Sequence, residues 1–418
     1  YLTTNLKLCN MKDPLPTTMS HMKQEDMHPD TVCVHVGYNP SEHHHAANPP
    51  IYLTSTFEFD TAEACAEAFA GTPQKNQTNI YSRLTNPTSE ILENRLAALE
   101  HAEAAIATAS GMGAIASTFW TFLSAGSVLI SSNRVYGCTY ALLAHQLTKF
   151  GVNVQFVDMT DLAKVREVAN KFEKVDMIYT ESIQNPTNDV VDLEELAKIA
   201  HSKNAKFVVD NTFATPLGCN PLKWGADLVV HSATKYLIGG VFTAGCCMGS
   251  KSDITQIRFV GVKDCTGSVL DPVLAFAMIQ GCETLHLRVK CMSDNAIKLA
   301  QYLENHPKVE RVIATGLPSH PQAGLIKKYI TIPNGLFSVY LKGGFHECCA
   351  MMNKFQLALR AVSLGKTHSL VNHPASMTHS TYTKEEKEKY GIADNLIRIS
   401  VGCEDIRDII ADFEQALE

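Results

Sequence analysis

The chain has 418 residues, of which 45% are hydrophobic and 19% charged, and its formal net charge is -7. This length predicts two or three domains with packed cores, and the Gly and Pro contents are too ordinary for a collagen-like or disordered chain. No apolar run approaches the ~18 residues that a membrane span needs, and no basic excess is available to neutralise nucleic-acid phosphates. We therefore expect a globular protein that binds a small ligand and has neither membrane nor nucleic-acid partners.

The cysteines bear on location and on metal binding. The 13 cysteines are scattered along the chain without any Cys-x-x-Cys pair. This spacing fits neither a zinc site nor a disulfide framework, so we expect reduced thiols, a cytoplasmic location and no metal. The opening residues lack the basic and apolar segments of a secretory signal. His43-His44-His45 could bind a metal weakly, but a solvated loop is the simpler interpretation.

Residues 1–80 differ from the rest of the chain. The first 60 are rich in Pro, His, Thr and Asn and show little periodicity. They predict an extended arm that wraps a partner subunit or is partly disordered, and we favour wrapping. We assign residues 1–80 to this arm and to an intersubunit segment. A helix capped by Asn86 and Pro87 follows and runs to about Glu100.

Residues 81–282 alternate helical and strand patterns, as expected of βαβ units around a mostly parallel sheet. The strands are predicted at 105–109, 127–132, 152–157, 175–180, 206–209 and 227–230. The helices between them are predicted at 111–123, 140–150, 161–172 and 193–202. This segment is the large α/β domain.

Residues 283–418 indicate a smaller α+β domain. A long helical pattern at 283–305 leads into it, and the charge run at 384–389 alternates in sign, which is typical of a solvated turn or helix. Its strands are predicted at 309–314, 336–341, 358–362 and 396–401, and its other helices at 345–353 and 405–417.

Three features follow predicted strands of the large domain, where open α/β sheets build their binding crevices. Ser110-Gly111-Met112-Gly113-Ala114 lets backbone N–H groups at a helix start approach an anion. Asp210 places a carboxylate at a buried strand end, which requires a cation or donors nearby. Lys235 follows another strand, beside the hydroxyls of Ser232 and Thr234, where desolvation favours a neutral, nucleophilic amine.

Each feature has a simpler explanation when taken alone. The glycines can serve a packed turn, Asp210 can cap the turn after it, and Lys235 can be a solvated charge or part of the Ser-x-x-Lys pattern of acyl-transfer enzymes. Together they match pyridoxal 5'-phosphate (PLP), which needs a lysine, an acid for its ring nitrogen, phosphate donors and an aromatic face. Tyr136 offers that face, although a Tyr there can also be a core residue. We expect PLP as a Schiff base on Lys235.

The chain also resembles a known family over about residues 31–417. It is similar to the transsulfuration family of PLP enzymes, which have the aspartate-aminotransferase-like fold (PLP fold type I), and within that family to the methionine γ-lyases. The segments that carry the resemblance are Tyr81–Thr88, Ser110–Ala114, Val208–Thr212, His231–Tyr236, Ala361–Gly365, His373–His379 and Ile397–Gly402.

The resemblance implies a role for each matching residue around the cofactor. Lys235 would hold its aldehyde, Asp210 would pair with the ring nitrogen, and Tyr136 would stack on the ring and protonate a departing thiolate. The phosphate would be held by Gly111, Met112, Ser232 and Thr234 and, across a subunit interface, by Tyr81 and Arg83. A homodimer with shared active sites, paired into a homotetramer, is therefore implied.

The substrate side is implied in the same way. Arg398, Ser363 and Asn185 would hold the substrate carboxylate and the phenolic edge of the cofactor. Cys138, Lys263 and Asp264 would shape a pocket for a thioether methyl, although Cys138 can also be a small buried hydrophobe and the other two an exposed ion pair. The expected reaction is α,γ-elimination of L-methionine to methanethiol, 2-oxobutyrate and ammonia.

The chain departs from the family pattern at three places, and other functions stay open. Glu181–Pro186 lacks the first Pro of its motif, Leu237–Phe242 is shorter and less polar than usual, and Gln280–Glu283 replaces a common Arg-Gly-Leu-Lys, which puts an ion pair in doubt. Within the family the alternatives are cystathionine γ-lyase, cystathionine γ-synthase and O-acetylhomoserine sulfhydrylase. Outside it, they are a non-catalytic scaffold and a nucleotide-binding oxidoreductase, which the missing G-x-G-x-x-G disfavours.

Overall fold

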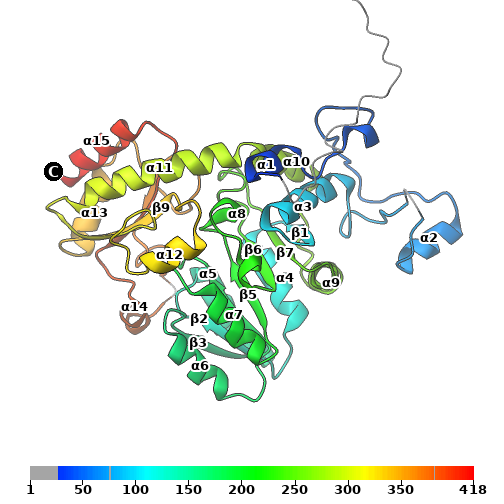
Figure 1. The fold of residues 1–418 in the computed structure, drawn as a ribbon, viewed down its shortest axis with the longest axis horizontal. Coiled ribbons are helices and arrows are strands. Elements are labelled where there is room, and N and C mark those ends of the chain that lie inside the picture. Colours follow the sequence, from blue (N-terminus) through cyan, green and yellow to red (C-terminus); the bar gives the residue numbers. More distant parts are fainter. Residues whose placement is uncertain (1–26, 75–76, 381) are drawn as a thin grey trace, which may run out of the picture.

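Two β-sheets organise the part of the chain that the structure, a computed structural model, describes, namely residues 27–74, 77–380 and 382–418. In Figure 1 the larger sheet lies near the centre and the smaller one at the left, close to the C-terminus. The first 26 residues of the expected arm lie outside the described residues.

The large sheet has seven strands in the order β1-β7-β6-β5-β4-β2-β3. Neighbouring strands are parallel except at β7, which is antiparallel to both β1 and β6. The predicted α/β class with a mostly parallel large sheet is therefore confirmed. The strands are β1 (Ala104–Thr108), β2 (Val128–Ser132), β3 (Asn153–Val157), β4 (Met177–Glu181), β5 (Lys206–Asp210), β6 (Leu228–His231) and β7 (Gly245–Gly249).

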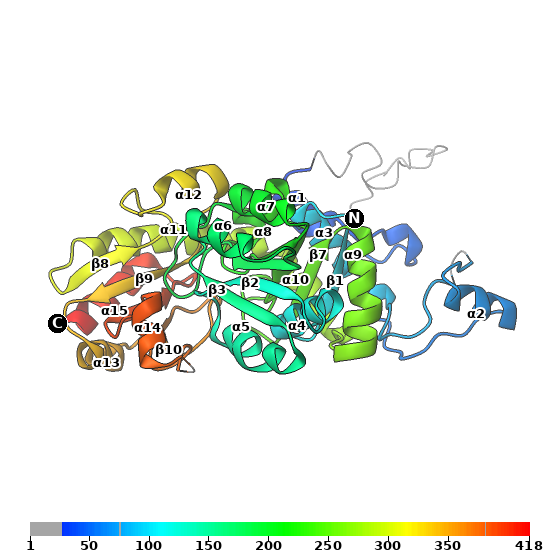
Figure 2. The ribbon, with the colours of Figure 1, turned by 90° about the horizontal axis from the view of Figure 1, so that it is seen from below.

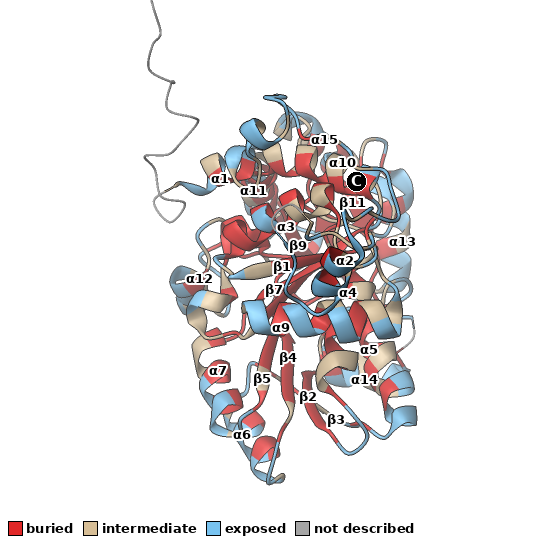
Figure 3. Ribbon diagram, turned by 90° about the vertical axis from the view of Figure 1, so that its right-hand side faces the viewer, coloured by how far each residue is buried: buried red, intermediate tan, exposed pale blue. Residues whose placement is uncertain are grey.

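Helices cover both faces of this sheet because its side chains alternate between two cores. Val209 and Val229 belong to one core and Val208 and Val230 to the other. Burial on both faces explains why these strands are continuously apolar, and Figure 3 shows them as the buried centre of the domain. The covering helices are α3 (Pro87–Glu100), α4 (Gly111–Phe122), α5 (Gly137–Ala141), α6 (Leu162–Asn170), α7 (Leu193–Ser202), α8 (Thr215–Gly218), α9 (Lys251–Gln256) and α10 (Pro272–Glu283).

The small sheet has five strands in the order β10-β11-β12-β9-β8, antiparallel except for the pair β10 and β11. Its strands are β8 (Val309–Ile313), β9 (Leu336–Leu341), β10 (Leu359–Arg360), β11 (Leu370–Asn372) and β12 (Leu396–Ser400). The helices of this part are α11 (Leu285–Glu304), α12 (Ala323–Tyr329), α13 (Phe345–Lys354), α14 (Lys384–Tyr390) and α15 (Ile406–Leu417). The long helix α11 runs from the large sheet toward the small one (Figure 1).

The described part of the N-terminal segment contains two α-helices and a short 3-10 helix at Pro40–Glu42. Helix α1 (Pro29–His35) packs on α3, α10 and α11 and buries Cys33, so this stretch is less extended than its composition predicted. Helix α2 (Ala62–Phe69) projects away from the body of the molecule (Figures 1 and 2). Large apolar side chains are exposed on this segment, with Leu53 at 72% and Phe69 at 69%.

Some element bounds differ from the sequence prediction. The helix predicted at 140–150 begins at Gly137 and continues as a π-helical turn and a 3-10 turn, because glycine at a helix start gives little helical signal. The helix predicted at 283–305 is α11 (Leu285–Glu304), whereas α10 (Pro272–Glu283), which precedes it, was not predicted. Among the described residues, no helix is long and apolar enough to cross a membrane.

An ion pair does occur at the unusual Gln280–Glu283 segment. Glu283 lies 3.6 Å from Nη1 of Arg95, a side chain only 2% exposed. Arg95 also donates hydrogen bonds to the carbonyl groups of Val34, Val36 and Ile279. A buried guanidinium needs such partners, and this one ties α3 to the N-terminal segment and to α10.

Candidate active site

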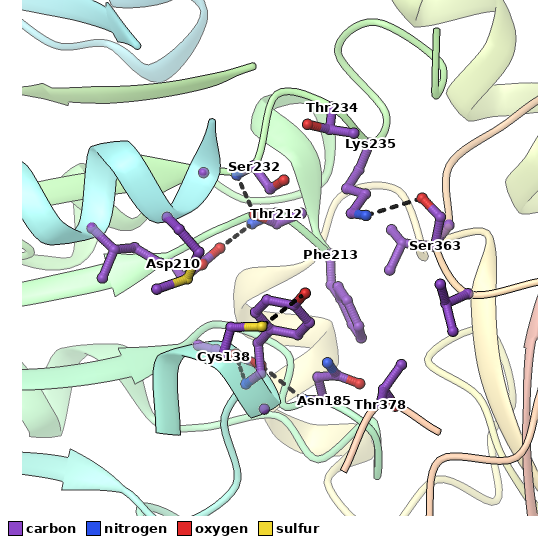
Figure 4. Close-up of a pocket in the computed structure, with 18 of the residues that line it drawn as sticks. Cys138, Asn185, Asp210, Thr212, Phe213, Ser232, Thr234, Lys235, Ser363 and Thr378 are labelled. Carbon is purple, nitrogen blue, oxygen red and sulfur yellow. Dashed lines mark hydrogen bonds between the residues drawn. The ribbon is translucent and has the colours of Figure 1, made fainter. Parts of the chain in front are cut away.

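A cavity of about 570 Å³ opens at the carboxyl ends of the parallel strands. Most of the residues proposed from the sequence line it, although they are spread over nearly 290 positions between Gly111 and Arg398. They are Gly111, Met112, Tyr136, Cys138, Asn185, Asp210, Ser232, Thr234, Lys235, Ser363 and Arg398. Figure 4 shows several of them around the cavity, with Asp210 and Lys235 from the large sheet's strand ends and Ser363 from the C-terminal part of the chain.

Lys235 follows β6 and points its amine across the cavity. The Nζ atom donates a hydrogen bond to Oγ of Ser363 at 2.9 Å (Figure 4). Burial and, to a lesser extent, the nearby positive charge of Arg398 together lower the pKa of Lys235 to about 8. A lysine with this pKa is partly neutral at physiological pH, so its lone pair is available for reaction.

Ser363 holds its hydroxyl against Lys235 from an unusual backbone conformation. Its φ angle is +110°, which L-residues rarely adopt. Such backbone strain concentrates at functional sites because the surrounding structure must maintain it.

Asp210 ends β5 and is only 8% exposed. Its Oδ1 accepts a hydrogen bond from the Thr212 N–H at 2.9 Å, while Oδ2 has only a long contact of 3.4 Å with the Tyr179 hydroxyl. Burial raises the pKa of Asp210, and the hydrogen bonds from Thr212 oppose this rise. A buried carboxylate that is only half satisfied favours a cationic group beside it.

The start of α4 forms an anion cradle with the turn after β6. Ser110 caps α4 by accepting from the Gly113 N–H at 3.0 Å, and the first-turn N–H groups of Gly111 and Met112 have no acceptor inside the helix. A Cβ atom at Gly111 would lie 2.7 Å from Cβ of Ser232, so any side chain there would fill the cradle.

Thr234 takes part less directly than the sequence predicted. Its hydroxyl donates to the carbonyl of Ala244 at 3.1 Å and accepts from the Ala244 N–H at 2.9 Å. The side chain therefore stabilises the turn around Lys235, and only its remaining lone pair faces other groups.

Tyr136 and Cys138 form a pair at the edge of the cavity. The Cys138 thiol donates to the Tyr136 hydroxyl oxygen over 3.4 Å. Burial and this contact raise the pKa of Tyr136 to about 12, so the phenol stays protonated and can donate a proton.

Glu181 completes the site and was not proposed from the sequence as a functional residue. Its two carboxylate oxygens accept from the N–H groups of Tyr136, at 2.6 Å, and Asn185, at 2.8 Å. The only sequence signal was its place at the end of a predicted strand, ahead of Asn185. The contact with Tyr136, 45 residues away along the chain, is not visible in such a pattern.

Arg398, from β12, lines the cavity but is only 3% exposed. Its Nη1 donates to Oδ1 of Asn185 at 2.9 Å and its Nη2 to the carbonyl of Ser363 at 3.1 Å. Within the described residues no carboxylate forms an ion pair with it. A buried guanidinium with neutral partners alone is suited to bind a carboxylate from a ligand.

Four of the proposed residues lie elsewhere in the single chain. Tyr81, Arg83 and Lys263 line a separate hollow beside the projecting α2 segment, and Asp264 pairs with Lys263 at 2.7 Å. Arg83 donates to the carbonyl of Lys263 at 3.1 Å and lies over the Tyr81 ring. The chain does not bring these four residues to its own cavity.

Comparison with known proteins identifies the family. The family model described as "Cys/Met metabolism PLP-dependent enzyme" matches residues 30–418. This chain belongs to that family. It is 50% identical over 371 residues to an L-methionine gamma-lyase of Fusobacterium nucleatum, covering 88% of this chain and 93% of that protein. It is 47% identical to an L-methionine gamma-lyase of Pseudomonas putida, covering 93% and 96%.

A solved structure supports both the fold and the cofactor. A putative O-acetylhomoserine (thiol)-lyase from Campylobacter jejuni matches with a TM-score of 0.88 and 33% identity, covering 94% of this chain and 100% of the other. That protein is described with a pyridoxyl-lysine monophosphate. The predicted family and the predicted PLP dependence are therefore confirmed.

The cavity of this family member fits PLP on the features already described. A partly neutral lysine, a half-satisfied buried aspartate, the N–H groups at the start of α4 and a tyrosine line one cavity. These are the groups that an aldehyde, a protonated ring nitrogen, a phosphate and a flat ring require.

Proposed function

We propose that the chain is a carbon–sulfur lyase that converts L-methionine to methanethiol, 2-oxobutyrate and ammonia. The observation that carries the proposal is that Lys235 and Arg398, both without a carboxylate partner among the described residues, face one cavity beside the Tyr136–Cys138 pair. Such a cavity suits an amino acid with a sulfur leaving group, and the relatives named above act on methionine by name.

The residues around the cavity would divide the binding of PLP between them. Lys235 would hold the aldehyde, Asp210 the ring nitrogen and Tyr136 a face of the ring. The N–H groups of Gly111 and Met112 would hold the phosphate, together with the hydroxyls of Ser232 and Thr234. When bound, PLP supplies an electron-withdrawing ring that stabilises negative charge on the substrate carbons.

Lys235 and Tyr136 would move the protons. Because its pKa is about 8 in the cofactor-free chain, the amine of Lys235 loses its proton readily near neutral pH. It would take a proton from the substrate Cα and, after releasing that proton, one from Cβ, whose electron pair would expel the sulfur from Cγ. The protonated Tyr136 hydroxyl, which accepts the Cys138 S–H, keeps its own proton for the departing thiolate sulfur.

Arg398 would orient the substrate by its carboxylate. The guanidinium is held by Asn185 on one side and by the Ser363 carbonyl on the other, so its remaining N–H groups can bind a carboxylate in a fixed direction. Asn185 would also lie at the phenolic edge of the cofactor, and Ser363 would release Lys235 and turn its hydroxyl to the substrate.

We further propose a homodimer with shared active sites, paired into a homotetramer and located in the cytoplasm. The support is that Tyr81 and Arg83 lie beside a projecting segment with exposed apolar side chains, away from their own cavity. In this arrangement they would reach the phosphate in the partner's site. Lys263, which Arg83 contacts, and Asp264 would approach the partner's cavity with them.

Product analysis tests the reaction. Purified protein with PLP is given methionine, cystathionine, homocysteine or O-acetylhomoserine, and the thiol and keto-acid products are identified. We expect methanethiol and 2-oxobutyrate from methionine at the highest rate. Turnover of cystathionine far above that of methionine would replace the proposal with cystathionine γ-lyase, and turnover of none of the four would favour a non-catalytic scaffold.

The Lys235→Ala variant tests the site. We expect a folded protein that forms no borohydride-fixable adduct with PLP, whereas the wild type retains a pyridoxyl group on Lys235 after reduction. Peptide mapping that finds this group on another lysine would refute the assignment.

A further inference from the structure

Glu181 and Asp210 are two neighbouring carboxylates with different surroundings. They end the adjacent parallel strands β4 and β5 and are paired in register, so both side chains face the cavity. Asp210 has one good donor and one long contact, whereas each oxygen of Glu181 has a short backbone donor. Both oxygens of Glu181 are therefore occupied by the protein backbone, whereas one oxygen of Asp210 remains available to a ligand.

The donors to Glu181 come from two loops that build the cavity wall. Tyr136 lies between β2 and α5, and Asn185 lies in the loop after β4. The hydrogen bonds of 2.6 Å and 2.8 Å have the short lengths of charge-assisted contacts. One carboxylate thus connects the backbone of the proposed proton donor to the backbone of the residue that supports Arg398.

We propose that Glu181 is a positioning residue that fixes the Tyr136 and Asn185 loops to the edge of the sheet. This inference rests on the proposed function insofar as Tyr136 protonates the leaving sulfur. The Glu181 side chain is 5% exposed and contacts no other loop by hydrogen bond among the described residues, so its two acceptors serve these two loops alone. Burial and the neighbouring Asp210 raise its pKa, and the two backbone donors oppose the rise.

Glu181→Gln tests the inference because it keeps the shape of the side chain. The amide oxygen can accept from only one N–H group, and the NH2 group then faces the other donor. We expect kcat to fall about 10- to 100-fold, as for other small displacements of catalytic groups. Glu181→Asp is too short to reach both donors, but it keeps two acceptor oxygens and places no NH2 group against either N–H, so its loss should be smaller than that of Glu181→Gln.

A double-variant comparison separates positioning from a general loss of stability. Because Glu181 also holds the Asn185 loop, which supports Arg398, part of its effect should remain without the Tyr136 hydroxyl. The fold loss in kcat caused by Glu181→Gln should nevertheless be several-fold smaller in a Tyr136→Phe background than in the wild type. The matched control is Glu93→Gln, which alters another buried glutamate that accepts a backbone N–H, outside the cavity. Its effect on kcat should be the same in both backgrounds. If the fold loss of kcat in the double variant equals the product of the losses in Glu181→Gln and Tyr136→Phe, the inference is overturned.

Thiol labelling of the cofactor-free chain gives a readout that needs no catalysis. Cys138 is exposed, lies in the first turn of α5 two residues after Tyr136 and contacts the Tyr136 hydroxyl, so its alkylation by iodoacetamide reports the position of Tyr136. Glu181→Gln should increase the labelling rate of Cys138 several-fold relative to Cys349, a partly exposed thiol on α13, and Glu93→Gln should not. An unchanged rate would count against the inference even if the enzyme proved not to cleave methionine.

Discussion

Arg398→Lys is the sharpest test of how the cavity binds its substrate. Lysine keeps the positive charge but has one nitrogen, which can reach either Asn185 or the Ser363 carbonyl and cannot bind a carboxylate through two parallel hydrogen bonds. The loss of one hydrogen bond to a charged group costs about 1.5–3 kcal/mol. Since each 1.4 kcal/mol is tenfold, kcat/KM for methionine should fall about 10- to 100-fold.

Methanethiol release, followed with a thiol reagent, measures this effect. The matched control is Arg407→Lys, because Arg407 is exposed and pairs with Asp405 at the surface, and it should leave kcat/KM unchanged. Methionine amide, which has no carboxylate, should be a poor substrate of the wild type and should lose little more in Arg398→Lys. An equal loss for methionine and its amide would refute carboxylate binding by Arg398.

Three further predictions follow from the site. Because the depressed pKa of Lys235 is about 8, its neutral amine becomes about tenfold more abundant between pH 7 and pH 9. The rate at which PLP attaches to the cofactor-free chain, measured by absorbance, should therefore rise about tenfold over this range. A rate that rises only above pH 10 would contradict the prediction. Mixing inactive Arg83→Ala chains with inactive Lys235→Ala chains should restore part of the activity, since one site of each mixed dimer is then intact; no recovery after verified subunit exchange would argue against shared sites. Cys138→Gly, which removes the donor to Tyr136, should lower methanethiol release from methionine more than turnover of cystathionine, and equal losses would remove Cys138 from substrate selection.

The sequence predicted most of the large sheet because its strands and helices carry clear local signals. Helix α7 lies at its predicted bounds, since Asp192 caps it and its apolar residues repeat at the helical period. Strand β7 was missed because Gly, Cys and Met have little strand propensity, and the pairing with β1 and β6 decides its conformation. Strand β11 was missed because three residues carry no readable alternation.

For the cavity, the sequence predicted residues that lie at strand ends and could not predict contacts between distant loops. Asp210 and Lys235 each follow an apolar run, so their placement at the sheet edge could be expected. The two donors to Glu181 and the hydrogen bond from Lys235 to Ser363 depend on how separate segments pack. The separation of Lys263 and Asp264 from Cys138 in one chain also depends on packing, although the sequence had grouped them.

At Ser363 the positive φ angle lowers the stability of the fold, while the side-chain hydroxyl supports activity. An L-residue held at +110° costs about 1–3 kcal/mol, which glycine would largely avoid. Glycine, however, has no hydroxyl to accept the hydrogen bond of Lys235. Selection of this enzyme for heat resistance alone would therefore favour Ser363→Gly early, and the more stable protein would lose turnover, because the same residue that weakens the fold holds the reactive amine in place.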